Sequence, residues 1–352
     1  MQEHIVRIFL ILLALLIGIA IGKWGLRSLP ESGEQDPALS AESASFWRTP
    51  FELIRIRSSA DSTSQPAYFY RAQGQTPRPL LVSLHTWSGD YTQEDTLAYL
   101  AKEQNWNYIH PDFRGPNRTV EACLSRKALR DIDDAIDYAI AQAPVDQGNL
   151  FIIGVSGGGY ATLGAYMRSS HRMKAFSAWA SISDLEAWYY ESRIRKSKYA
   201  DDIEGCLGGG KEFDAVSART RSPLYWKTPD HSGARLDIYA GINDGYTGSV
   251  PVTHSLFFYN KVIRDQGCTN QERLVSDAAI LSLLKYRKPP RPGDFGMIGE
   301  RKIVYRNHLQ NISVTIFEGG HEMLPEYAFQ SLVTLAGEQV SSKQRVSVDA
   351  RN

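Results

Sequence analysis

From residue 46 onward, short runs of β-branched and aromatic residues alternate with longer segments whose apolar residues recur near i, i+3 and i+4. The short runs predict strands at residues 53–57, 67–71, 80–84, 107–110, 150–155, 175–181, 236–240 and 314–317. The longer segments predict helices at residues 93–104, 126–142, 160–168, 252–265 and 322–336. This alternation indicates an α/β fold with a mostly parallel, twisted sheet covered by helices on both faces.

Two stretches, residues 183–230 and 268–310, are too long for ordinary connections in such a sheet. They are interpreted as lid-like insertions over the site. The first is rich in aromatic residues, which would suit either a lid with a sugar-stacking wall or a small satellite core under a long loop. These aromatics are Trp188, Tyr189, Tyr190, Tyr225 and Trp226.

The N-terminus carries an unbroken apolar run at residues 8–22, bounded by Arg7 and Lys23. The run predicts export to the periplasm or the exterior. Residues 1–22 would be either a signal peptide cleaved before Lys23 or a membrane anchor with Trp24 at the interface. Residues 23–45 have the composition of a linker, residues 46–342 are expected to form one catalytic domain, and residues 343–352 are expected to be a flexible tail.

Charge and cysteine content narrow the classes of partner. The chain has 39 basic and 39 acidic residues, so it has no bulk positive field for nucleic acid, and the basic runs at 193–196 and 285–288 are interpreted as solvated faces. Its three cysteines, Cys123, Cys206 and Cys268, show no metal-binding spacing and allow at most one disulfide. A Cys206–Cys268 bridge is the working guess, and three unpaired thiols are the alternative.

Candidate chemistry begins at residues 154–158, a G-x-S-x-G sequence that follows an apolar strand and leads into a helix. Glycines around the serine permit the tight, strained turn of a nucleophile elbow. The helix that follows would direct its N-terminal N–H groups at a developing oxyanion. We therefore predict that Ser156 is the nucleophile of a serine hydrolase.

A serine nucleophile needs a histidine base and a carboxylate that orients the histidine. His321 is the one histidine after the last predicted strand, on a glycine loop before the final helix. Asp244 follows the strand at 236–240 and is preferred over Asp237, which lies within that strand. The base and the carboxylate are therefore predicted to be His321 and Asp244.

Two N–H donors are needed to hold the oxyanion. The first should be Gly157, the residue after the nucleophile, and the second should be Trp87 or Thr86 in the loop after the strand at 80–84. Trp87 is also a candidate wall of the acyl pocket, with core packing as the alternative interpretation.

These segments resemble the catalytic domain of the prolyl oligopeptidase family of α/β hydrolases. The resemblance rests on His85, on the sequence Asp-Phe-Arg-Gly at 112–115, on the elbow at 154–160, and on Gly320 with His321. It implies the α/β-hydrolase fold and a Ser156, Asp244 and His321 triad. The chain differs from the family where an aromatic residue commonly follows the nucleophile, because Gly157 stands there.

The substrate is less constrained than the nucleophile. The preferred hypothesis is an exported carboxylic-ester hydrolase acting on a small-molecule or polysaccharide ester, such as acylated or methyl-esterified carbohydrate, without metal or cofactor. The alternatives are a small peptidase of the prolyl oligopeptidase type and, more remotely, a non-catalytic binding module. Candidate substrate-contacting residues are His85, Arg114, Trp188 and Tyr189.

Overall fold

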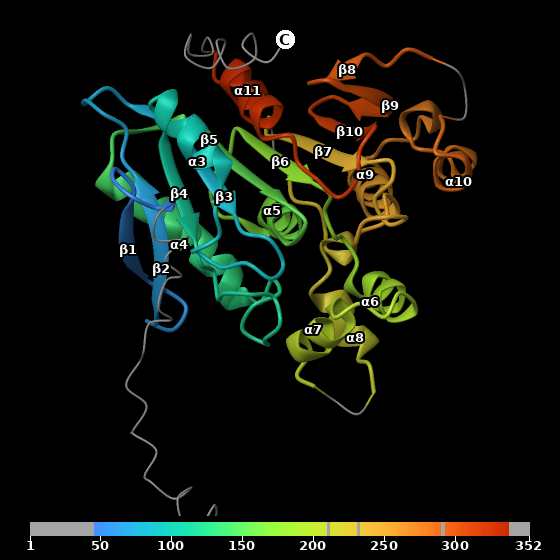
Figure 1. Ribbon diagram of the computed structural model, residues 1–352, viewed down its shortest axis with the longest axis horizontal. Coiled ribbons are helices and arrows are strands. Elements are labelled where there is room, and N and C mark those ends of the chain that lie inside the picture. Colours follow the sequence, from blue (N-terminus) through green and yellow to red (C-terminus); the bar gives the residue numbers. More distant parts are fainter. Residues whose placement is uncertain (1–45, 210–211, 231–232, 290–292, 338–352) are drawn as a thin grey trace, which may run out of the picture. The chain divides into compact units, whose positions relative to one another are not determined.

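The computed structural model describes residues 46–209, 212–230, 233–289 and 293–337 (Figure 1). The predicted export segment, the linker and the tail lie outside these residues. In the described part of the chain, no helix is both long and apolar enough to span a membrane.

The centre of the protein is a ten-stranded sheet with the order β1-β2-β4-β3-β5-β6-β7-β10-β9-β8. Strands β4, β3, β5, β6, β7 and β10 are parallel, and the strands at both edges pair antiparallel. The bounds are β1 (Glu52–Arg57), β2 (Ser64–Tyr70), β3 (Arg78–Leu84), β4 (Asn107–Pro111), β5 (Val145–Val155), β6 (Ala175–Trp179), β7 (Arg235–Gly241), β8 (Met297–Ile298), β9 (Arg301–Leu309) and β10 (Ile312–Phe317). The predicted α/β-hydrolase architecture is confirmed.

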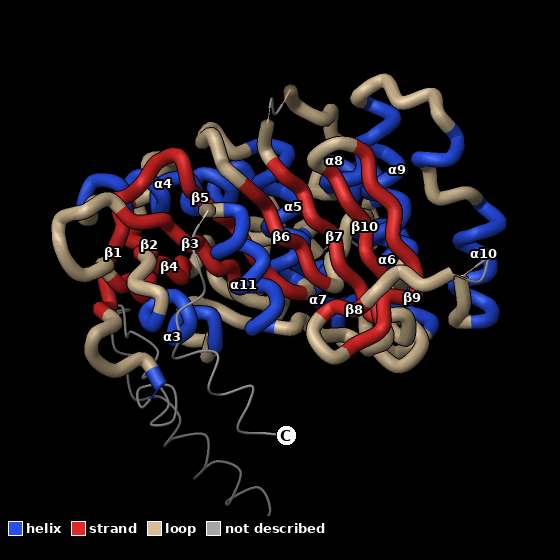
Figure 2. Tube along the Cα trace, turned by 90° about the horizontal axis from the view of Figure 1, so that it is seen from above, coloured by secondary structure: helices blue, strands red, loops and turns tan. Residues whose placement is uncertain are grey.

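Helices cover both faces of this sheet (Figure 2). One face packs against α3 (Thr96–Glu103) and α11 (Pro325–Leu335), and the other against α4 (Arg126–Gln142), α5 (Gly157–Arg168) and α9 (Thr253–Asp265). Strand β5 shows why both faces are apolar: Phe151 and Ile153 join one core while Leu150 and Ile152 join the other, because successive side chains in a strand point to opposite faces.

The first predicted insertion is a small helical cap made of α6 (Leu185–Ile194), α7 (Tyr199–Cys206), α8 (Ala215–Thr220) and the short helix η1 (Pro223–Tyr225). Asp184 caps the N-terminus of α6, because its carboxylate accepts hydrogen bonds from the N–H groups of Glu186 and Ala187. Tyr189 stacks on Phe213 with ring centroids 3.9 Å apart. Part of the aromatic content therefore packs within the cap, where it is continuous with the main core and does not form a separate satellite core.

The second predicted insertion is wrong in part. After η2 (Gln271–Arg273) and α10 (Asp277–Tyr286), the chain returns to the sheet as β8 and β9. Strand β9 pairs antiparallel with β10 in the register Leu309 to Ile312, and Ile303 and Tyr305 are buried. Residues 301–309 therefore extend the sheet rather than cover the site.

The guessed disulfide is also wrong. Cys123, in the turn before α4, is bonded to Cys206, the last residue of α7, and Cys268 is free. The Cα atoms of Cys123 and Cys206 lie 6.0 Å apart, a normal separation for a disulfide. The bridge ties the cap to the core beside the first turn of α4.

Candidate active site

Ser156 lies at the turn between β5 and α5. Its backbone has φ 59° and ψ −118°, a conformation that side-chain-bearing residues rarely adopt. The turn is held by hydrogen bonds from the Ser156 N–H to the Trp179 carbonyl and from the Tyr160 N–H to the Ser156 carbonyl, both 2.9 Å. Such local strain is typical of a nucleophile elbow, where the turn presents the serine hydroxyl at the end of the strand.

Asp244 and His321 meet beyond the carboxyl ends of β7 and β10. The Nδ1 atom of His321 lies 2.7 Å from Oδ2 of Asp244. The other carboxylate oxygen accepts hydrogen bonds from the backbone N–H groups of Gly245 at 2.9 Å and Val250 at 3.0 Å. The Asp244 side chain is fully buried, so its orientation toward His321 is set by the loop around it.

Asp237, the rejected alternative, has different partners. Its carboxylate receives hydrogen bonds from Arg235 and from the hydroxyl of Ser313, both at 2.6 Å. It lies within β7, as the sequence indicated. The structure thus pairs His321 with Asp244.

The loop between β7 and α9, residues 242–252, is called the acid loop because it carries Asp244. Gly248 allows this loop to pack closely around Asp244 and His321. A Cβ atom at Gly248 would lie 2.4 Å from Oδ1 of Asp244 and 2.8 Å from Cβ of His321. Any side chain here would push the loop away from the pair. The sequence analysis did not identify Gly248, because the approach involves residues far apart in the chain.

The loop after β3 has one free N–H beside the elbow. The N–H and hydroxyl of Thr86 both donate to Oε1 of Gln93, at 3.0 and 2.6 Å. Within the described chain, the N–H of Trp87 has no acceptor, and the N–H of Gly157 opens α5, where helix geometry leaves it unpaired. Trp87 and Gly157 are therefore the candidate oxyanion donors, and Thr86 is not.

These two donors are close together because residue 157 is glycine. A Cβ atom at Gly157 would lie 2.1 Å from the backbone nitrogen of Trp87. We expect Gly157→Ala to displace the loop and lower kcat by about 10²- to 10³-fold, the cost of losing one oxyanion donor. Steady-state kinetics and a melting curve would check this.

Gly293→Ala is a matched control for that variant. A Cβ atom there would make only ordinary contacts, 3.5 Å or more, and Gly293 lies outside the elbow and its loops. An unchanged kcat for Gly157→Ala in a folded protein would contradict the proposed donor pair.

His85 and Arg114, two of the predicted substrate-contacting residues, have their polar atoms bonded within the protein. The ring nitrogens of His85 lie 2.9 Å from the carbonyl oxygen of Thr86 and 2.7 Å from that of Asp112, and the residue is fully buried. The Arg114 guanidinium is also buried and paired with several carboxylates, those of Asp131, Asp61 and Glu121. Both residues stabilise loops, because their polar atoms are already bonded within the protein.

Trp188 and Tyr189 are buried as well, at 0% and 5% exposure. The indole N–H of Trp188 donates to the Ser249 carbonyl at 2.9 Å, and its ring packs edge-on against Trp87. The hydroxyl of Tyr189 donates to Glu204. Trp188 therefore joins the cap to the site loops, Tyr189 packs within the cap, and neither ring offers a stacking surface.

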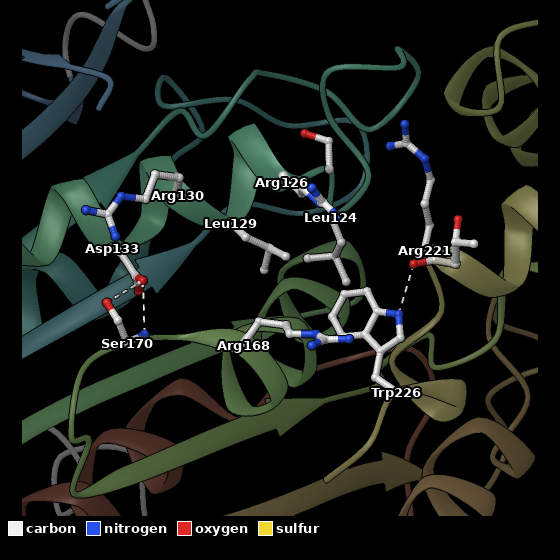
Figure 3. Close-up of a pocket in the computed structure, with 11 residues that line it drawn as sticks. Leu124, Arg126, Leu129, Arg130, Asp133, Arg168, Ser170, Arg221 and Trp226 are labelled. Carbon is white, nitrogen blue, oxygen red and sulfur yellow. Dashed lines mark hydrogen bonds between the residues drawn. The ribbon is translucent and has the colours of Figure 1, made fainter. Parts of the chain in front are cut away.

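A cavity of about 650 Å³ lies elsewhere, between the start of α4, the end of α5 and the segment after α8 (Figure 3). Arg168 lies over the ring of Trp226, 5.0 Å from its centroid. Burial lowers the pKa of Arg221, another lining residue. Neither the triad residues nor the oxyanion donors line this cavity.

Across the described residues, no three His, Cys, Asp or Glu side chains are grouped so that they could hold a metal ion.

Comparison with known proteins agrees with the geometry. The model of the prolyl oligopeptidase family matches residues 93–224, a range that includes Ser156 and ends before Asp244. The fold resembles an acylaminoacyl peptidase from Pyrococcus horikoshii, with a TM-score of 0.56, 17% identity, and coverage of 82% of this chain and 40% of that one.

Two other solved structures are similar. Oligopeptidase B from Leishmania major has a TM-score of 0.55 and 12% identity, covering 82% of this chain and 36% of that one. A puromycin-hydrolyzing peptidase from Mycobacterium tuberculosis has a TM-score of 0.52 and 17% identity, covering 81% and 38%. This chain thus spans about two fifths of the length of these proteins. Its fold is that of the α/β hydrolases, and it resembles the catalytic domain of the prolyl oligopeptidase family.

Proposed function

We propose that the protein cleaves acyl bonds through an acyl-enzyme on Ser156. The observation that carries the proposal is the 2.7 Å pairing of His321 with the buried Asp244, together with the strained elbow at Ser156. Because Asp244 accepts from Nδ1, Nε2 of His321 is the nitrogen left to take the Ser156 proton. The N–H groups of Gly157 and Trp87 would then hold the oxyanion that forms.

The second half of the reaction uses the same groups. His321, now protonated, gives its proton to the leaving group, and the acyl chain stays on the oxygen of Ser156. A water molecule then donates a proton to His321 and attacks the acyl carbon, and His321 returns that proton to the oxygen of Ser156 as the acid leaves.

We propose amide bonds of short peptides as the preferred substrates. The three similar solved structures support this choice, since all of them are peptidases. We therefore prefer the peptidase hypothesis, which the sequence analysis held as the alternative, to the ester hydrolase hypothesis.

Ester hydrolysis is the second candidate, and one contact favours it. The position after the nucleophile, commonly aromatic in the prolyl oligopeptidase family, is Gly157 here, and the space of its side chain is filled by the backbone of Trp87. No aromatic ring can project into the site from this position. Recognition of the substrate must therefore differ from the family pattern at the nucleophile.

One substrate panel separates the two candidates. Aminoacyl, acyl-aminoacyl and prolyl peptide amides would be compared with acetylated, methyl-esterified and feruloylated glycans at equal enzyme concentration. We expect the highest kcat/KM for a peptide amide and no turnover by Ser156→Ala. A glycan ester with the highest kcat/KM would establish the second candidate and leave the triad unchanged.

A further inference from the structure

The turn between α6 and α7, residues 195–198, lies against both loops of the site. We call it the cap corner. On one side, Nζ of Lys198 donates to the hydroxyl of Ser88 at 2.9 Å. On the other, Nη1 of Arg195 donates to the carbonyls of Ser249 at 3.0 Å and Gly248 at 3.4 Å.

These contacts place the corner next to the reacting groups. Ser88 follows Trp87, whose backbone nitrogen abuts Gly157, and Gly248 abuts both Asp244 and His321. The cap corner therefore bridges the acid loop and the loop after β3 that contains Trp87, which we call the oxyanion loop. A substrate bound at Ser156 would have Gly157, which adjoins the first loop, and His321, which adjoins the second, beside it, so the corner that joins the two loops would lie near it.

The charge of the corner is only partly neutralised. Lys198 is paired with Asp202 at 2.7 Å. Arg195 is exposed, binds carbonyl oxygens through Nη1 alone, and has no carboxylate partner anywhere in the described residues. Its remaining N–H groups can therefore bind a ligand. Arg193, two residues earlier, differs because it contacts Glu204 and the hydroxyl of Tyr189.

We propose that Arg195, with Lys198 beside it, forms a carboxylate-binding subsite, so that preferred substrates carry a negative charge close to the scissile bond. A guanidinium fixed by backbone carbonyls offers its other N–H groups in the planar arrangement that matches a carboxylate. The proposal rests on the proposed function, since the subsite acts on substrates of Ser156.

Pairs of esters that are similar in size but differ in charge test this subsite. The first pair has its charge in the acyl part: the p-nitrophenyl half-ester of glutaric acid and p-nitrophenyl pentanoate. The second pair has its charge in the leaving group: para-acetoxybenzoate and its methyl ester. Activated esters are used because a serine hydrolase can cleave them whichever natural bond it prefers. Comparing the ratio of kcat/KM within each pair across variants cancels the intrinsic reactivity of the esters.

We expect Arg195→Gln to lower the acid-to-neutral ratio about tenfold in at least one pair, the change that about 1.4 kcal/mol produces. That pair identifies the side of the scissile bond that the subsite binds. Arg195→Lys should retain part of the ratio, and Arg193→Gln should leave it unchanged. The difference should shrink as salt is raised, because exposed charges are screened.

The result separates this proposal from the proposed function. Unchanged ratios in both pairs for Arg195→Gln, with normal fluorophosphonate labelling of Ser156, would overturn the subsite and leave the serine hydrolase intact. Loss of labelling in the wild-type protein would overturn both.

Discussion

Ser156→Ala will abolish labelling by a fluorophosphonate probe and lower kcat by roughly 10⁶-fold, as loss of a serine nucleophile does in a complete triad. The probe forms its bond with the serine oxygen, and alanine has no atom there. Intact-protein mass spectrometry with and without probe would measure the effect. Folding should be retained, since Ser156 makes no side-chain capping bond to α5.

Ser331→Ala is the control for that experiment. Ser331 lies on α11, and its hydroxyl donates only within that helix, to Ala328. It should label like the wild-type protein. Labelling that persists in Ser156→Ala would show that another residue is the nucleophile.

Asp244→Asn should lower kcat by about 10⁴-fold while leaving the fold in place. The backbone of the acid loop fixes how the side chain of residue 244 is oriented. One oxygen of residue 244 must still accept from the N–H groups of Gly245 and Val250, so the amide nitrogen of asparagine would face Nδ1 of His321. That arrangement requires an unprotonated Nδ1 and puts the proton on Nε2, which then cannot accept the Ser156 proton.

Asp237→Asn is the matched control, because it makes the same carboxylate-to-amide change within β7, the strand that precedes Asp244, and disturbs only the contacts with Arg235 and Ser313. Its kcat should stay close to the wild-type value. The pH–rate profile of each variant would show whether the histidine still titrates. A large loss of kcat in Asp237→Asn, with Asp244→Asn unaffected, would reverse the assignment of the carboxylate.

Much of the central sheet and its helices could be predicted because local patterns determine them. The helix predicted at 126–142 coincides with α4, which begins after Ser125, a capping residue whose hydroxyl accepts from the Ala128 N–H. Strand β9 was missed because its apolar run, Ile303 to Tyr305, is only three residues long and is flanked by charged and polar residues in a segment assigned to an insertion. Its place in the sheet depends on pairing with β10.

The site also has features that the sequence predicts and features that depend on residues far apart in the chain. Asp244 and His321 each follow a parallel strand, β7 and β10. Their meeting could be predicted because the carboxyl ends of parallel strands share one edge of the sheet. Burial of Trp188 and Arg114 does not follow, since it depends on partners far along the chain. The basic run at 193–196 looked like a solvated face, and its contact with the acid loop becomes visible only when the cap is folded.

The disulfide between Cys123 and Cys206 makes the intervening chain a macrocycle that contains Ser156, the cap corner and α7. A cap joined to the core only at its two chain ends could rotate away from the core about those two connections. Here the last residue of α7 is fastened covalently to the turn before α4, so this part of the cap cannot lift from the core while the bond is intact. Substrate entry would then require rearrangement of the cap corner and the two loops that it touches. A single proteolytic cut within the macrocycle would leave both fragments joined by the disulfide.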